Sequence, residues 1–386
     1  MKPKSNSKLS VAVLFGSRSS EHEISILTAL QAISAMDSLA YDIMPVYLHP
    51  NGKFYVGKKL FEKSFYRQFA SDQVEEVTLL PDPQSKGFVN LAKGQLLPVD
   101  LYFLCFHGQY GEDGCIQGLL ELKRAAYTGS SLLATAVAMN KYICKLVVKE
   151  YGIPTLPHVR VRKEEALRSF RQCQEAIRAT PGLTAWPLFV KPCQLGSSIG
   201  ISIAKNEREL QAALAKAFYY DNEVLIEPAL TNFMEINIAV LGGDPPIASV
   251  VEIPKATGAL LSYEDKYLRG GKKGSSQEGM AALSRVINPD IDPAIKNEIT
   301  GYALKAFSAL GCSGVGRFDF MVDLTDGKIY FNELNPIPGS LSFYLWEKSH
   351  PQLLYTEMIN QMIQEAQKLR NAKLSLQQNL EFKALK

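Results

Sequence analysis

The segment from Gly316 to Gly339, GRFDFMVDLTDGKIYFNELNPIPG, constrains the fold more than any other part of the chain. Two runs that alternate apolar and polar residues flank the sequence Asp-Leu-Thr-Asp-Gly, a pattern that predicts a β-hairpin. Successive side chains of a strand point to opposite faces. Arg317 and Asp319 therefore share one face of the first strand, and Glu333 and Asn335 share one face of the second.

The length of the hairpin loop decides whether these two polar pairs meet. A loop of three residues, 325–327, would place its glycine where a left-handed conformation is required. That register pairs Asp319 with Glu333 and Arg317 with Asn335. A two-residue loop would instead place the pairs on opposite faces. We expect the three-residue loop, which forms a single patch of two carboxylates, an amide oxygen and a guanidinium.

A patch of this composition is typical of a magnesium site. Neighbouring carboxylates repel each other unless a cation lies between them, and Mg²⁺ prefers oxygen ligands together with phosphate groups. We therefore interpret Asp319, Glu333 and Asn335 as metal ligands. On this segment alone, a surface hairpin with a ladder of salt bridges remains an alternative.

Two lysine-containing segments are suited to phosphate groups. Lys191 ends a strand-like run in LFVKPCQLGSSIG, and a turn at residues 196–198 follows it. Backbone N–H groups of such turns can bind anions, although no lysine follows the glycine, so this is not a Walker A loop. Lys141 lies near the start of a helix in AMNKYICK. Each segment alone would also fit an ordinary turn or a solvated helix.

A strand-like run, VLIEPAL at residues 224–230, enters an irregular segment. Its backbone could pair with the edge of an adenine, and Glu227 could accept a hydrogen bond from the exocyclic amine. Alone, the run would be read only as the end of a strand.

The N-terminal segment FGSRSSEHEIS, residues 15–25, predicts a turn from a strand into a helix. Ser20 and Glu23 have the spacing of a capping box, which would place Glu21 in the first helical turn. Glu21 either complements the helix dipole or holds a substrate ammonium, because open α/β sheets bind ligands at this edge. His107 follows the run LYFLCF at the same kind of edge, although a lone histidine is usually structural.

Chain length and hydrophobic pattern predict several domains, because 386 residues exceed what one core usually holds. In residues 1–129, strands alternate with helices, which predicts a parallel sheet. Residues 130–227 fit a small α+β lid. Residues 228–368 again alternate strands and helices, and they include a long loop at 257–286 that we expect to be mobile. Residues 369–386 are a polar tail.

Composition excludes several classes of protein. The net charge of +3 is small for this length, which argues against a nucleic-acid surface and against a polybasic arm at a membrane. No apolar run reaches the roughly 18 to 20 residues of a membrane helix, and no signal-peptide core is present. The six cysteines form no Cys-x-x-Cys pair, so neither a zinc site nor a redox motif is indicated. We expect a cytoplasmic protein.

Together these segments resemble the D-alanine–D-alanine ligases of the ATP-grasp superfamily. The resemblance extends from Val11 to about Met362, and its motifs occur in the family's order: FGSRSSEHEIS, FHGQYGEDGCIQGLLE, YTGSS, MNK, VKPCQLGSSIG, LIEPAL, SYEDKY, GRFDF and NELNPIPGS. It implies a fold of α/β and α+β parts, in a three-domain ATP-grasp architecture. The N-terminal domain would be Rossmann-like, and ATP would lie between the other two.

The resemblance also implies a role for individual residues. The residues that would bind ATP are Lys141, Lys191, Ser197, Ser198, Glu227, Leu230 and Glu235. Two Mg²⁺ (or Mn²⁺) ions would be bound by Asp319, Glu333 and Asn335. The residues that would contact D-alanine are Glu21, His107, Lys266, Arg317, Ser340, Ser342 and Tyr344. The reacting centre would contain Glu21, Ser197, Tyr267, Arg317 and the backbone N–H of Gly339.

The implied function is ATP-dependent ligation of two D-alanines through an acyl phosphate, for peptidoglycan precursors, by a homodimer. One alternative is a ligase with a different second substrate, such as D-lactate, D-serine or another amine. Another is an inactive ATP-binding protein. The intact metal-site residues and both lysines argue against the inactive protein, because a module that only binds ATP need not keep them.

One position departs from the family pattern. Many of these ligases have a serine five residues after the Pro-Gly turn, where it helps to hold the carboxylate of the second D-alanine. The aligned residue here is Tyr344, whose phenol can donate one hydrogen bond but is bulkier. Ser340 or Ser342 could supply the hydroxyl instead. Because Lys266 and Tyr267 are kept, as in members that use an amine nucleophile, we expect D-alanine as both substrates.

Overall fold

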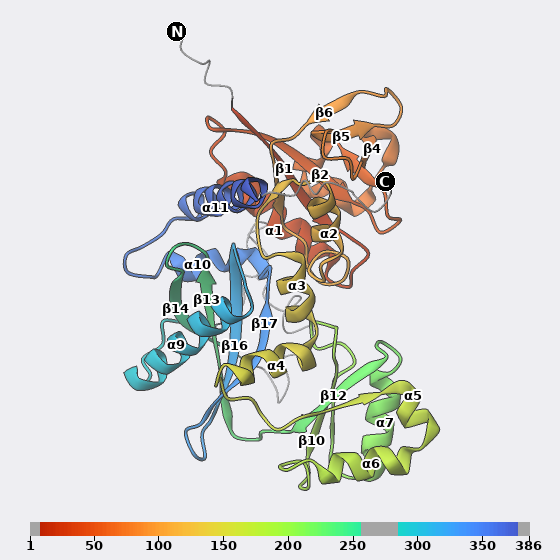
Figure 1. The fold of residues 1–386 in the computed structure, drawn as a ribbon, viewed down its shortest axis with the longest axis vertical. Helices are drawn as coiled ribbons and strands as arrows, with labels where there is room; N and C mark the ends of the chain where they lie inside the picture. The colour runs from red at the N-terminus through yellow and green to blue at the C-terminus, as the bar shows by residue number, and fades with distance from the viewer. Residues whose placement is uncertain (1–7, 256–284, 377–386) are drawn as a thin grey trace, which may run out of the picture.

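The computed structural model describes residues 8–255 and 285–376 of the chain. These residues form three sheets of eight, four and five strands. Figure 1 shows the eight-stranded sheet at the top, the five-stranded sheet in the middle and the four-stranded sheet at the bottom. None of the helices in the described part of the chain is long and apolar enough to cross a membrane.

The eight-stranded sheet contains the N-terminal strands in the order β6-β5-β4-β3-β2-β1-β7-β8. Its parallel part is β1 (Leu9–Gly16), β2 (Tyr41–Leu48), β7 (Leu101–Leu104) and β8 (Ala126–Tyr127). Its antiparallel part is β3 (Phe54–Val56), β4 (Glu75–Leu79), β5 (Gly87–Asn90) and β6 (Leu96–Pro98). The helices are α1 (His22–Ala35) and α2 (Cys115–Leu122). Residues 11–15 of β1 are fully buried, as expected for a parallel strand covered on both faces.

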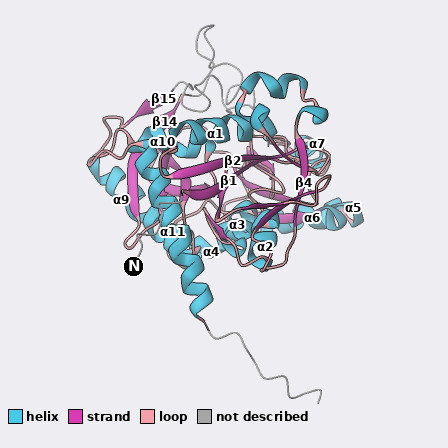
Figure 2. Ribbon diagram, turned by 90° about the horizontal axis from the view of Figure 1, so that it is seen from above, coloured by secondary structure: helices cyan, strands magenta, loops and turns pink. Residues whose placement is uncertain are grey.

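The C-terminal helix α11 (Tyr355–Ser375) packs against this first sheet. Figure 2 shows it near α1, and it contacts β7 and β8 at one end of the sheet. Its buried residues Met358, Ile359 and Met362 belong to the same core as β1. The helix also extends to Ser375, so part of the segment expected to be a polar tail is helical.

The four-stranded sheet is antiparallel, in the order β11-β10-β12-β9. Its strands are β9 (Val159–Arg162), β10 (Leu188–Pro192), β11 (Ser202–Ala204) and β12 (Glu223–Pro228), and its helices are α5 (Lys163–Arg168), α6 (Phe170–Ala179) and α7 (Glu207–Ala217). The helical pattern of residues 162–179 in the sequence would fit one continuous helix. The structure has two, because Ser169 leaves the helical conformation and its hydroxyl accepts a hydrogen bond from the N–H of Gln172, which caps α6.

The five-stranded sheet has the order β15-β14-β13-β16-β17. Its strands are β13 (Phe233–Leu241), β14 (Ile247–Pro254), β15 (Arg285–Ile287), β16 (Val315–Asp323) and β17 (Ile329–Asn335). The helices α3 (Leu132–Met139), α4 (Lys141–Glu150) and α9 (Pro293–Ala309) contribute to its core or pack beside it. After β17 the chain forms a short 3₁₀ turn at Gly339–Ser342 and helix α10 (Phe343–Trp346). The expected loop at 257–286 lies outside the described residues, apart from its last two.

The hairpin of β16 and β17 has the predicted residue pairing, but the length of its loop differs from the prediction and its register is shifted by a bulge. Arg317 lies opposite Asn335, and Asp319 lies opposite Glu333, as predicted. The three-residue loop is wrong: the N–H of Asp323 bonds to the carbonyl of Lys328, so four residues, 324–327, form the loop. A β-bulge next to Asp319 then shifts the register by one residue. Without this bulge, Glu333 would point to the opposite face.

Gly327 in this loop has a left-handed backbone conformation, with φ of 72°. A Cβ atom at Gly327 would meet nothing within 4 Å, and the same is true of Gly301 in the middle of α9, where φ is not positive. Gly327→Ala should therefore lower the free energy of unfolding by about 1 kcal/mol. Gly301→Ala should raise it by about 0.5 to 1 kcal/mol. Urea denaturation of both variants tests this pair, and shifts of the same sign would contradict it.

Candidate active site

A cavity of about 480 Å³ lies between the four-stranded and five-stranded sheets. Its size is typical of a small-molecule site. The seven residues predicted to bind ATP all line this cavity: Lys141, Lys191, Ser197, Ser198, Glu227, Leu230 and Glu235. Glu333 of the acidic hairpin lines it too. The fold therefore brings together segments that are almost 200 residues apart in the sequence.

Lys191 is held in the cavity wall by two acceptors. Its Nζ lies 2.7 Å from Oε2 of Glu227 and donates to Oδ1 of Asn332 at 3.0 Å. Asn332 precedes Glu333 at the β-bulge. The bulge therefore lets the hairpin present Asn332 to Lys191 while Glu333 stays beside Asp319.

Glu227 has a second lysine partner that the sequence did not indicate. Lys145 of α4 is fully buried, and its Nζ lies 2.7 Å from Oε1 of Glu227. Burial acts to raise the pKa of Glu227, but the charges of Lys145 and Lys191 outweigh it and lower the pKa to about 2. Both carboxylate oxygens thus contact lysines, which adds a role to the one expected for Glu227 at an adenine amine. Lys145 could have been found from its position four residues after Lys141, which places the two lysines on the same side of one helix.

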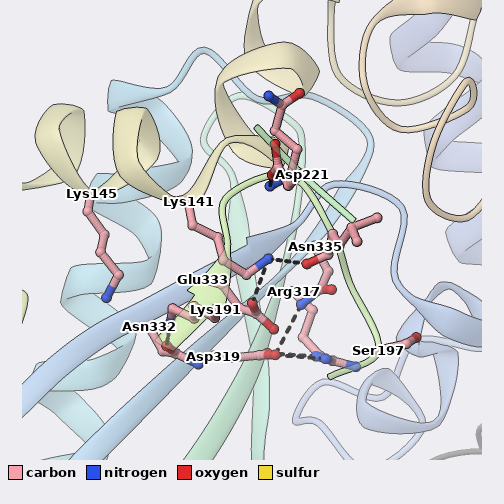
Figure 3. A network of polar contacts seen from close by, with 12 residues as sticks. Lys141, Lys145, Lys191, Ser197, Asp221, Arg317, Asp319, Asn332, Glu333 and Asn335 are labelled. Atoms are coloured by element: carbon pink, nitrogen blue, oxygen red, sulfur yellow. Dashed lines mark hydrogen bonds and ion pairs between the residues drawn. The ribbon is translucent and has the colours of Figure 1, made fainter. Parts of the chain in front are cut away.

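Lys141 connects three segments of the site. Asn140 caps α4 and places Lys141 at its first position. The Nζ of Lys141 donates to the carbonyl of Leu195 at 2.7 Å and lies 3.3 Å from Oε2 of Glu333. Figure 3 shows Lys141 approaching Glu333 from the helix side, with Lys191 and Asn332 beneath them. The ammonium group therefore joins the loop before Ser197 to the acidic hairpin.

The acidic hairpin is held by charge pairing. Arg317 donates from Nε and Nη2 to the two oxygens of Asp319 at 2.7 and 2.8 Å, and Asn335 Nδ2 donates to Asp319 at 3.0 Å. Burial opposes the charge on Arg317, but Asp319 holds its pKa well above the usual range. Among the described residues, no three His, Cys, Asp or Glu side chains are grouped for a metal ion. The set of two carboxylates and one amide oxygen nevertheless fits the oxygen preference of Mg²⁺.

Glu21 joins the first sheet to the ATP cavity. Helix α1 begins at His22 with Glu21 at its N-cap, so the expected Ser20–Glu23 capping box is wrong. The Ser197 hydroxyl donates to Oε1 of Glu21. A Cβ atom at Gly196 would lie only 2.9 Å from Oε2 of Glu21. A side chain at position 196 would therefore displace the carboxylate of Glu21.

His107 is buried and lies at the start of a hydrogen-bonded chain. Its Nε2 lies 2.8 Å from the Thr28 hydroxyl, which also accepts from the N–H of Ser340 at 3.0 Å. Burial lowers the pKa of His107 to about 4, a backbone hydrogen bond to Ile337 opposes this shift, and the charge of Arg317 adds to it. The imidazole is therefore neutral at pH 7. It links the first sheet to the turn that follows β17.

Glu112 is a site residue that sequence reasoning missed. Its carboxylate accepts from the N–H of Gly108 at 2.6 Å and from the N–H of Ile337 at 2.9 Å. The side chain is buried, and burial raises its pKa well above the usual range, with the charge of Glu21 adding to the effect. The signal was present in HGQYGEDG, where an acidic residue lies within a glycine-rich loop at a sheet edge. The resemblance drew attention to His107 in this motif and not to Glu112.

The turn after Gly339 places the predicted acceptor residues. Residues 340–342 are left-handed in succession, with φ between 49° and 53°. Such conformations are strained in residues other than glycine and cluster at functional sites. Ser340 and Ser342 are buried. The Tyr344 hydroxyl donates to Oε1 of Glu252 at 3.2 Å. Lys266 and Tyr267 lie outside the described residues.

Comparison with known proteins agrees with this geometry. Residues 10–130 match the family model described as the D-ala D-ala ligase N-terminus, and residues 147–364 match the model of the D-ala D-ala ligase C-terminus. The chain belongs to the D-alanine–D-alanine ligase family. It is 35% identical to a D-alanine–D-alanine ligase of Thermosipho africanus over 92% of each chain.

Solved structures of the family share the fold. A D-alanine–D-alanine ligase from Coxiella burnetii has a TM-score of 0.78 and 27% identity, covering 95% of this chain and 96% of its own. A D-Ala:D-Ser ligase from Enterococcus faecalis has a TM-score of 0.76 and 27% identity, covering 93% of this chain and all of its own. Membership confirms the ATP-grasp fold and an ATP-dependent ligase, as predicted from the sequence.

The neutral His107 gives a pH dependence of stability. Its folded-state pKa of about 4 lies below the ordinary value of 6.5. The contribution of the neutral His107 to the free energy of unfolding is therefore fully present above pH 6.5 and is lost as the pH falls through 4. Relative to His107→Gln, the wild type should lose up to about 3 kcal/mol of unfolding free energy over this interval. Urea denaturation near pH 7 and near pH 4 measures the difference, and parallel pH profiles would contradict it.

Proposed function

We propose that this enzyme uses ATP to join two D-alanines into D-alanyl-D-alanine for peptidoglycan precursors. The contact between Glu21 and Ser197 supports this proposal best. It places a carboxylate suited to an amino acid's ammonium group directly beside the cavity that contains Lys141 and Lys191. Such a junction favours a reaction in which ATP activates an amino acid.

The donor D-alanine would bind at the junction. Glu21 would hold its ammonium group, and the neutral His107 would form part of the wall without adding a second charge. The donor carboxylate is a poor electrophile, and transfer of the γ-phosphoryl group of ATP converts it into an acyl phosphate with a good leaving group. Lys141 and Lys191 would hold the phosphate groups in position, and Ser197 and Ser198 would close over them.

Adenosine would lie deeper in the cavity. Leu230 and the backbone near Glu227 would contact the adenine, and Glu235 would contact the ribose. We infer that the carboxylate of Glu227 also fixes Lys191 through their ion pair. Asp319, Glu333 and Asn335 would bind two Mg²⁺ (or Mn²⁺) ions. Such ions neutralise phosphate charge during transfer.

The acceptor would bind along the turn after β17. Its amine attacks the acyl phosphate, and the negative charge that develops on the former carboxylate oxygen needs donors aimed at it. Arg317 and the backbone N–H of Gly339 would supply them. Lys266 and Tyr267 are proposed to help exclude water, which would otherwise hydrolyse the acyl phosphate.

D-Alanine as the acceptor is the finer part of the proposal. Ser340, Ser342 and Tyr344 would form the acceptor pocket, with Tyr344 in place of the family serine. The main alternative is D-serine, since a structural relative from Enterococcus faecalis is a D-Ala:D-Ser ligase. We also propose a cytoplasmic homodimer with domains 1–129, 130–227 and 228–368, in which α11 covers the first domain.

Glu333→Gln should abolish ligation, because it removes one of the two carboxylates proposed to bind metal, while the fold is retained. We expect kcat to fall by at least about 100-fold with no change in the thermal unfolding midpoint beyond a few degrees. Glu347→Gln is a matched control, because it makes the same chemical change at a residue that does not line the cavity. Normal turnover of Glu333→Gln with Mg²⁺ would rule out the metal assignment.

Release of phosphate from ATP, with Mg²⁺ and D-alanine, tests the function itself. D-Alanine, D-serine, D-lactate and glycine should be compared as acceptors with D-alanine as donor. We expect D-alanine to give the highest kcat/KM, because discrimination is a ratio of these values, and mass spectrometry should identify D-alanyl-D-alanine. No phosphate release would favour the inactive ATP-binding protein. A higher kcat/KM for another acceptor would keep the ligase but change its product.

A further inference from the structure

A row of polar residues crosses one face of the five-stranded sheet. We call this the active face, because it carries Asp319 and Glu333. Residues directly opposite each other on neighbouring strands share a face. Glu333 pairs with Asp319, Asp319 with Asn237, and Asn237 with Glu252. The row that begins with the proposed metal ligands therefore continues two strands further, to Glu252 on β14. Glu252 is about 10 Å from Asp319 by the usual strand spacing.

The edge strand β15 adds an arginine to the same face. Arg285 pairs with Pro254, which lies two residues after Glu252 and thus on the same face. The Arg285 side chain is only 7% exposed, and its Nη1 lies 2.6 Å from Oε2 of Glu252. The sheet itself therefore directs Arg285 toward the active face.

Tyr344 completes a buried cluster with these two residues. Its hydroxyl donates to Glu252 at 3.2 Å and also contacts Nη1 of Arg285. The guanidinium carbon of Arg285 lies 4.3 Å from the centre of the Tyr344 ring, in cation–π geometry. The guanidinium of Arg285 is thus paired with the carboxylate of Glu252 and packed against the face of the Tyr344 ring.

A second arginine, Arg317, is close enough to Tyr344 to affect its pKa. Burial raises the pKa of the Tyr344 phenol, Glu252 adds to the shift, and the charges of Arg285 and Arg317 oppose it. Both guanidinium groups are therefore within electrostatic reach of this phenol. Its one hydrogen is donated to Glu252, so the phenol does not offer it to a ligand. The strong donors that flank the aligned serine position are the two arginines.

We propose that Arg285 binds the carboxylate of the acceptor amino acid together with Arg317, and that Glu252 and Tyr344 position its guanidinium. The inference rests on the proposed function, since it concerns the acceptor of that reaction. A guanidinium carries five N–H donors in a planar fork that matches a carboxylate. The acceptor class is then a small amino acid with a free carboxylate.

The test compares D-alanine with D-alaninamide, which lacks the carboxylate, as acceptors for the full-length enzyme with ATP and Mg²⁺. Arg285→Gln should lower kcat/KM for D-alanine by about 10- to 100-fold, the usual effect of losing a hydrogen bond between charged groups. The value for D-alaninamide should change by less than about threefold. The KM for the donor D-alanine should not change, because Glu21 and His107 lie elsewhere.

Two further variants separate binding from folding. Arg171→Gln removes an arginine that is 88% exposed and paired with Glu175, and it should leave both acceptors unaffected. Arg285→Lys keeps the charge, so it should retain part of the preference for D-alanine even where Arg285→Gln fails to fold. If both Arg285 variants lowered kcat/KM equally for the two acceptors, the inference would be overturned, but the proposed function would stand. Absence of dipeptide from the wild type would overturn the proposed function, and the inference with it.

Discussion

The bulged pairing of β16 with β17 determines the chemistry of the site. A regular hairpin with the observed four-residue loop would turn Glu333 toward the hydrophobic core. The extra residue next to Asp319 returns Glu333 to the face that carries Asp319 and Arg317. It also presents Asn332 to Lys191. One irregularity of one strand thus decides which side chains can act on a phosphate group.

Charge pairing holds the side chains of this site in place. Lys141, Lys145 and Lys191 lie in or near the cavity, and each contacts a carboxylate of β12 or β17. Arg317 contacts Asp319 in the same way. Removing Glu227, the carboxylate that pairs with both Lys145 and Lys191, would leave uncompensated buried charges, which is strongly destabilising. The groups that would act on ATP are therefore also groups that hold the two sheets together.

Much of this arrangement could be predicted from the sequence, because strands and helices follow local hydrophobic periodicity. The pairing of Asp319 with Glu333 was predicted correctly, although from the wrong loop length. A bulge depends on tertiary contacts such as that between Asn332 and Lys191, which no local pattern reports. For the same reason, Glu112 and Lys145 were missed: their partners, Ile337 and Glu227, are distant in the chain. Glu252 and Arg285 became visible only once the order of the strands was known.

The position of α11 has a consequence for how the chain is made. Its residues Met358, Ile359 and Met362 complete the core built around the first strand of the protein. A ribosome synthesises β1 more than 300 residues before this helix, and domains generally fold as they emerge. The N-terminal sheet therefore waits, with an apolar surface uncovered, until nearly the whole described chain has been translated. During synthesis, this surface is where a chaperone would be most useful.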